Sequence, residues 1–128
     1  MAETERVICR VEQLVDGGLA VKFDLTLAEP PRTLPGFAIA YDGAHYAYIN
    51  SCPHRGTELD WQPGEVFDDS GLYLVCATHG ALFEPTSGLC VGGPCHGDRL
   101  RPLPIKVVGN DVVLIHHAAA IDNEKHET

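Results

Sequence analysis

Two short segments of this sequence each combine a cysteine with a histidine. The first places Cys52 two residues before His54, and the second places Cys76 three residues before His79. A glycine follows each pair closely, so both segments are expected on loops and not inside regular elements. Together they supply two thiolates and two imidazoles, which is a full ligand set for a metal centre.

Two kinds of metal centre fit this donor set. Zinc binds two cysteines and two histidines in a closed tetrahedron. A [2Fe–2S] cluster can instead be held with two cysteines on one iron and two histidines on the other. In a zinc finger the two cysteines usually share one turn and the two histidines come from a helix. Here each loop brings one of each, which favours two irons held between two loops and leaves structural zinc as the alternative.

The ligand pattern resembles the signature of the Rieske family of [2Fe–2S] proteins. The pair Cys52-x-His54, followed by Cys76-x-x-His79, is similar to the two ligand segments of that family. The resemblance implies one [2Fe–2S] cluster per chain, with all four residues as its ligands. It also implies an all-β, Rieske-like sandwich or barrel of antiparallel strands, in which two loops form a cluster-binding subdomain.

The resemblance extends well beyond the four ligands, over about Phe37 to Val113. Residues 76–83 closely resemble the second ligand segment of the family, and residues 84–88 resemble the turn that follows it. Residues 92–94 look like the proline-containing loop that covers the cluster. The segment between the two ligand pairs is slightly longer than is usual in ferredoxins of this family.

The residues near the second ligand pair predict a low reduction potential. In high-potential relatives a serine and a tyrosine donate hydrogen bonds to the sulfurs, whereas the matching positions here are Ala81 and Phe83. Those relatives also link the two loops by a disulfide, and the matching positions here are Thr57 and Thr78. Because hydrogen bonds to sulfur stabilise the reduced cluster, their loss places the potential near the bottom of the Rieske range of about −150 to +300 mV.

The rest of the chain predicts short strands separated by turns. Expected strands are Val7 to Val11, Leu19 to Leu25, Phe37 to Tyr41, Tyr46 to Ile49, Leu72 to Val75, Ile105 to Val108 and Val112 to Ile115. Asp42-Gly43 is typical of a tight hairpin turn, while residues 29–31 and 35–36 are expected to frame a loop. Nine prolines and thirteen glycines disfavour long helices, so an all-β fold is expected.

Length and charge restrict the classes of function. The 128 residues suit one domain, expected over residues 1–116, with cluster-binding loops at about 51–103 and a polar tail at 117–128. A formal net charge of −9 disfavours partners such as nucleic acid or an anionic membrane. The sequence has neither a secretion signal nor an apolar run long enough for a membrane helix. A cytoplasmic protein, provisionally a monomer, is therefore expected.

The remaining cysteines allow several interpretations. Cys90 and Cys95 could be small loop residues, could form a local disulfide, or could bind a second metal together with His96. A reducing cytoplasm favours the first interpretation. Cys9 lies in an expected strand and is interpreted as an inert buried thiol.

The resemblance implies electron transfer and not catalysis. The chain is too short to include the mononuclear iron domain of an oxygenase, so we expect a carrier that passes single electrons from a reductase to an oxygenase or another terminal enzyme. A redox-sensing module and a zinc-stabilised binding domain remain alternatives.

Overall fold

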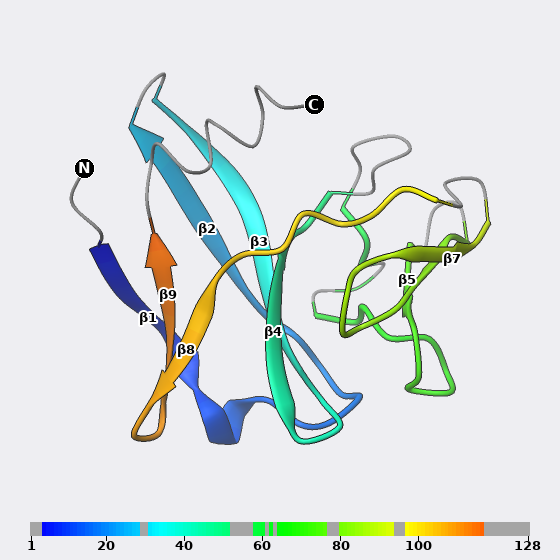
Figure 1. The fold of residues 1–128 in the computed structure, drawn as a ribbon, viewed down its shortest axis with the longest axis horizontal. Coiled ribbons are helices and arrows are strands. Elements are labelled where there is room, and N and C mark those ends of the chain that lie inside the picture. Colours follow the sequence, from blue (N-terminus) through cyan, green and yellow to red (C-terminus); the bar gives the residue numbers. More distant parts are fainter. Residues whose placement is uncertain are drawn as a thin grey trace.

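The computed structural model describes residues 4–28, 31–51, 58–60, 62, 64–76, 80–93 and 97–116. Within these ranges the structure is almost entirely β-sheet (Figure 1). The elements in chain order are β1 Thr4–Arg10, η1 Val11–Gln13, β2 Val21–Ala28, β3 Pro31–Tyr41, β4 Ala44–Ile49, β5 Leu74–Val75, β6 Leu82–Phe83, β7 Cys90–Gly92, β8 Ile105–Val108 and β9 Asp111–His116. None of the described segments is a helix long and apolar enough to cross a membrane. The predicted tail, residues 117–128, lies outside the described residues.

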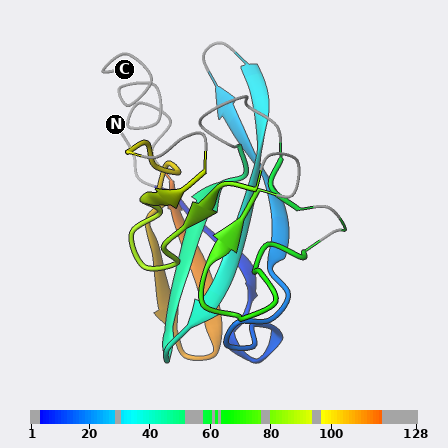
Figure 2. The ribbon, with the colours of Figure 1, turned by 90° about the vertical axis from the view of Figure 1, so that its right-hand side faces the viewer.

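The strands form three antiparallel sheets of three strands each, in the orders β1-β9-β8, β2-β3-β4 and β5-β6-β7. The sheet β2-β3-β4 lies in the middle. The sheet β1-β9-β8 flanks it on one side and the small sheet β5-β6-β7 on the other (Figures 1 and 2). The all-β fold predicted from the sequence is confirmed.

Strand β3 shows why the middle sheet is buried on both faces. Successive side chains of a strand point to opposite faces. Phe37 and Ile39 belong to the core shared with the small sheet, whereas Ala38 and Ala40 belong to the core shared with β1-β9-β8. A strand covered on both faces reads as a continuous apolar run and not as an alternating pattern, as this segment does.

The hairpin predicted around Asp42-Gly43 is present. Strands β3 and β4 pair with Tyr41 opposite Ala44, so Asp42 and Gly43 form the two-residue turn between them. Both turn residues have positive φ, 52° and 82°, as the preferred tight hairpin turn requires. Strands β8 and β9 form a second hairpin, with Val108 opposite Asp111.

The prediction that residues 29–31 and 35–36 frame a loop is wrong for residues 31–36, while residues 29 and 30 lie outside the described residues. Strand β3 begins at Pro31 and stays paired with β2 through Pro35 and Gly36. Pairing of β3 with β4 begins only at Gly36. The two prolines lie before this pairing, where a missing N–H is tolerated, although the Pro35 carbonyl still accepts from the N–H of Asn50 just after β4. Gly36 is required because the ring of Phe23 lies across it, 2.8 Å from where a β-carbon would stand.

The region expected to be irregular, about 51–103, contains the whole small sheet. The strands of this sheet are only two or three residues long, which is too short for an alternating pattern that would predict them from the sequence. Of the strand expected at Leu72 to Val75, only Leu74–Val75 is extended, and Leu72 is exposed on the preceding bend. The small sheet is what places Cys76, directly after β5, in the core.

Candidate metal centre

One of the four predicted ligands, Cys76, lies in the described part of the chain. Cys52, His54 and His79 lie outside the described residues. Cys76 follows β5 directly and is fully buried in the core between the small sheet and the middle sheet. Its position shields a metal-bound thiolate from water, which suits a cluster ligand.

The loop that carries the second ligand pair is closed at its neck by two hydrogen bonds. The Cys76 N–H donates to the carbonyl of Ala81 at 2.9 Å, and the Gly80 N–H donates to the carbonyl of Cys76 at 2.7 Å. Gly80 has a φ of +73°, a left-handed conformation that favours glycine. In the structure its N–H closes the loop, so the glycine serves backbone conformation.

The segment around Gly93 packs against the neck of this loop. Gly93 has a φ of +91°, and a β-carbon added there would stand 2.8 Å from the α-carbon of Ala81 and 3.3 Å from the carbonyl oxygen of Gly80. Gly93 thus brings its backbone directly onto the second ligand loop. The last residue of the expected covering loop, Pro94, lies outside the described residues.

The two positions expected to lack a hydroxyl near the cluster are both buried. Ala81 adjoins the closed neck, and Phe83 lies on β6 opposite Cys90. Both belong to the same core as Cys76. Neither side chain offers a hydrogen-bond donor.

The first ligand loop is bracketed by a polar network that the sequence analysis missed. The side-chain carbonyl of Asn50 accepts a 2.8 Å hydrogen bond from the Leu59 N–H. Its amide donates to the carboxylates of Asp60 at 3.0 Å and Glu58 at 3.3 Å. The ammonium of Lys22, on β2, pairs with the same two carboxylates at 3.0 and 2.9 Å. In the sequence, the segment 52–57, which carries the first ligand pair, comes between Asn50 and Glu58.

A family model for the Rieske [2Fe–2S] domain matches residues 4–105 of the sequence. The chain belongs to the Rieske [2Fe–2S] domain family. Its cofactor is therefore one Rieske cluster per chain, a centre that carries single electrons. The closed loop behind Cys76, and the backbone that Gly93 lays against it, are compatible with such a cluster.

Solved structures share the fold of this Rieske domain. The ferredoxin of carbazole 1,9a-dioxygenase from Nocardioides aromaticivorans IC177 matches with a TM-score of 0.67 and 22% identity, over 87% of this chain and 96% of that one. The Sphingomonas yanoikuyae B1 ferredoxin matches with a TM-score of 0.65 and 18% identity, over 89% and 100%. A chain in the complex of reduced oxygenase and oxidized ferredoxin of carbazole 1,9a-dioxygenase has a TM-score of 0.66 and 18% identity, over 87% and 92%. A search of the curated proteins finds no significant match.

Tyr48 ties the turn after the second ligand segment to the middle sheet of the Rieske domain. Its buried hydroxyl donates to the carbonyl of Pro85 at 2.7 Å. Gly88 lies against the same ring, since a β-carbon there would stand 2.9 Å from Cε1 of Tyr48. Burial raises the pKa of Tyr48 well above its ordinary value, so the phenol stays protonated and keeps its donor.

Replacing Tyr48 by phenylalanine removes this donor and leaves the Pro85 carbonyl buried without it. We expect the free energy of unfolding to fall by about 1–3 kcal/mol, the usual cost of a buried group left without a partner. Urea unfolding followed by circular dichroism measures the change. Tyr73→Phe, at a partly exposed site, is the control and should shift stability by less than about 0.5 kcal/mol. Equal effects of the two variants would contradict the assignment.

The Asp60 carboxylate is the most buried charge of the network, with its side chain only 2% exposed. Burial acts to raise its pKa. Hydrogen bonds from Asn50, from Lys22 and from the Gly64 N–H (3.0 Å) outweigh burial and lower the pKa below the ordinary value of 3.8. The carboxylate is therefore held ionised in the folded protein.

A lowered pKa makes the contribution of Asp60 to stability depend on pH. The unfolded chain binds the proton more readily, so this contribution is complete above pH 3.8 and is lost as the pH falls through the lowered folded value. We expect Asp60→Asn to be less stable than the wild type at neutral pH and the difference to shrink in acid. Urea unfolding at a series of pH values measures it. A difference that grows in acid would contradict the sign.

Two further cysteines of the Rieske domain, Cys9 and Cys90, lie in the described part of the chain. Cys9, on β1, is buried, and burial raises the pKa of its thiol, as expected of an inert side chain. Cys90 is buried on β7, with its Sγ 3.2 Å from the carbonyl oxygen of Gly92. Cys95 and His96 lie outside the described residues, so the alternatives that involve them stay predictions.

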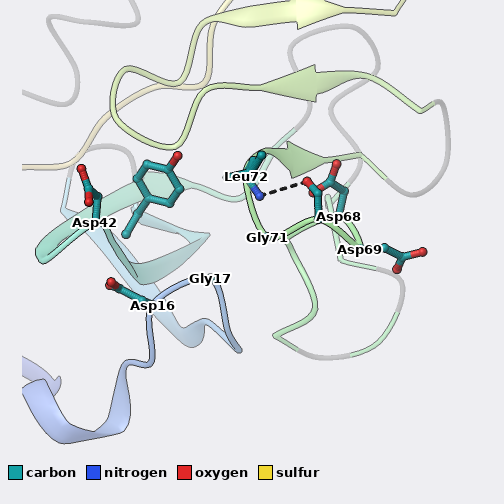
Figure 3. Close-up of a pocket in the computed structure, with 9 residues that line it drawn as sticks. Asp16, Gly17, Asp42, Asp68, Asp69, Gly71 and Leu72 are labelled. Carbon is teal, nitrogen blue, oxygen red and sulfur yellow. Dashed lines mark hydrogen bonds between the residues drawn. The ribbon is translucent and has the colours of Figure 1, made fainter.

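An open pocket of about 640 Å³ carries negative charge, and Cys76 is not among the residues that line it. Asp16 and Asp42 lie on one side of it, and Asp68 and Asp69 on the other (Figure 3). Asp16 accepts from the N–H of Gly43 in the turn between β3 and β4, and Asp68 accepts from the hydroxyl of Ser70 in its own loop. In the described part of the chain no three histidine, cysteine or acidic side chains gather closely enough to hold a metal ion.

Proposed function

We propose that this Rieske domain is a one-electron carrier whose cluster is held by Cys52, His54, Cys76 and His79. The observation that carries the proposal is the buried Cys76 at the closed neck of its loop, three residues before His79, in a chain that matches the Rieske family over residues 4–105. When bound, the cluster accepts and releases a single electron. The two thiolates would hold one iron and the two imidazoles the other.

We further propose that the carrier works at low potential. A cluster with two neutral imidazoles is less negative than one with four thiolates and is therefore easier to reduce. Hydroxyl donors near the sulfurs would raise the potential further. Ala81 and Phe83 supply none from the positions where high-potential relatives have them. The proposed potential thus lies near the lower end of the Rieske range.

The proposed partners are a reductase that donates the electron and an oxygenase, or another terminal enzyme, that accepts it. Support comes from the similar structures, which include ferredoxins and a complex of a ferredoxin with its oxygenase. We place the carrier in the cytoplasm, as a single domain over residues 1–116 that acts as a monomer.

A redox titration of the purified protein tests this proposal. It should show one reversible one-electron transition, with a midpoint in the lower part of the interval of about −150 to +300 mV. A midpoint above about +100 mV would overturn the low-potential assignment while keeping the carrier. A colourless protein without any reversible transition would overturn the proposed function itself.

A further inference from the structure

The side chain of Asn50 spans the neck of the first ligand loop. Its carbonyl accepts from the Leu59 N–H, and its amide donates to Asp60 and Glu58, eight to ten residues further along the chain. Asn50 is 1% exposed and is the one polar residue found fully buried in the described part of the chain. Both polar ends of this side chain are therefore used to join the two ends of the segment 52–57.

Each side of this neck is anchored separately to the sheets. On the incoming side, the N–H of Asn50 donates to the carbonyl of Pro35 on β3 at 2.8 Å, and the N–H of Ile49 donates to the carbonyl of Arg101 at 2.9 Å. These two bonds fix the end of β4 just before the ligand segment begins. The incoming side is thus held by the middle sheet even without Asn50's side chain.

On the outgoing side, Asp60 is the anchor. Its carboxylate accepts from the Gly64 N–H, and the carbonyl of Gly64 accepts from the N–H of Ala20 at 2.8 Å. Gly64 has a φ of +85°, and a β-carbon there would stand 2.9 Å from the carbonyl oxygen of Ala20. Lys22 on β2 adds a direct bond to the same carboxylate. The outgoing side is therefore held against the start of β2.

The buried polar groups of this network are better explained by a need for one fixed geometry than by their contribution to stability. Burying a carboxylate and an amide costs desolvation free energy, and the hydrogen bonds between them do little more than compensate for it. Apolar residues of similar size often stabilise a core as well or better. What a satisfied polar network provides is one defined geometry, because any shift leaves a buried group without its partner. Here the geometry fixed is the separation between residue 50 and residues 58–60.

We propose that Asn50 and Asp60, supported by Lys22, are positioning residues that hold the two ends of the first ligand loop at the separation in which Cys52 and His54 bind the cluster. The inference rests on the proposed ligand set. Ligands held ready by neighbouring hydrogen bonds bind metal more tightly, and loss of such supporting bonds typically lowers affinity or activity by about 10- to 100-fold. The second ligand loop needs no such clamp, because its own backbone closes it.

The test compares Asp60→Asn and Asn50→Ala with Asp68→Asn. Asp68 carries the same chemical change but lies on the exposed loop before β5, away from the neck. The protein is purified with its cluster and mixed with an excess of an iron chelator, at a temperature at which circular dichroism shows every variant folded. We expect both neck variants to lose iron about 10- to 100-fold faster than wild type, and Asp68→Asn to stay within about twofold.

Electron paramagnetic resonance separates positioning from simple destabilisation. In the folded, reduced neck variants we expect a shifted or broadened cluster signal, because the geometry at the first loop is no longer unique. A variant that only lowers the unfolding temperature, with wild-type signal and wild-type iron loss while folded, would overturn the proposal. Equal iron loss from Asp68→Asn and Asp60→Asn would overturn it as well.

Hydrogen exchange of the purified full chain tests the clamp, meaning the hydrogen bonds from the Asn50 side chain to residues 58–60, independently of which residues bind the cluster. The Leu59 amide should be protected in the wild type and should exchange at least about tenfold faster in Asn50→Ala, because its acceptor is gone. Unchanged exchange would overturn the clamp. If the wild-type protein binds no iron at all, the proposed function fails, and with it the role of the clamp in metal binding, even where the amide is protected.

Discussion

Cys76→Ser is expected to yield a folded, colourless protein without iron. A serine hydroxyl is hardly ionised at neutral pH and is a much poorer iron ligand than the thiolate it replaces. Cys76 is enclosed by the core of the small sheet, so the serine that replaces it would be buried as well. Iron and sulfide analysis, together with the visible spectrum, measures the loss.

Cys9→Ser is the matched control for this prediction. Cys9 is also buried, but it lies on β1 in the core between the two large sheets. Both substitutions bury a hydroxyl, so both should lower the stability of the fold, and only Cys76→Ser should remove the iron. Full iron content in Cys76→Ser, or equal loss in the two variants, would rule out Cys76 as a ligand.

Gly93→Ala is expected to destabilise the protein by about 3 kcal/mol and to impair cluster retention. The added methyl meets the α-carbon of Ala81 at 2.8 Å, and backbone cannot rotate away as a flexible side chain could. The cost combines overpacking, about 1–3 kcal/mol, with the left-handed backbone, about 1–2 kcal/mol. The second ligand loop must shift, so both urea unfolding and iron loss to a chelator should respond.

Gly97→Ala isolates the steric part of this effect. Gly97 has a φ of +97°, close to that of Gly93, but no atom of the described residues lies within 4 Å of where its β-carbon would stand. It should therefore cost only about 1–2 kcal/mol, from backbone strain, and should leave the cluster in place. If the two glycine variants behaved alike, the close approach between Gly93 and the ligand loop would have no consequence.

Much of the fold could be predicted because local signals and tertiary structure agree. Asp42-Gly43 supplies two residues that tolerate positive φ, and the strands on either side have the apolar content of a buried sheet. The prolines at 31 and 35 were misinterpreted because a proline usually signals a loop, and a strand accepts one only where its missing N–H needs no partner. Which side of a strand is bonded depends on its neighbours, and no local pattern reveals that.

The candidate site also has a part that could be predicted from the sequence and a part that could not. The type and spacing of the ligand residues identify the chemistry, since few other centres use two such pairs. The network of Asn50 and Asp60 was missed because its members are ten residues apart and meet only when the loop between them folds back. A weak signal was available: Asn50 follows the apolar end of a strand, and Asp60 stands between Leu59 and Trp61. Polar residues so placed are often buried and paired.

Pulsed electron paramagnetic resonance of the dithionite-reduced protein tests the central claim most directly. A cluster held by two cysteines and two histidines must show magnetic coupling to two ligand nitrogens, since the electron spin spreads onto the imidazoles. We predict a red-brown protein with one [2Fe–2S] cluster per chain and those two nitrogen couplings. A colourless zinc protein, or an iron–sulfur signal without histidine nitrogen, would contradict the account.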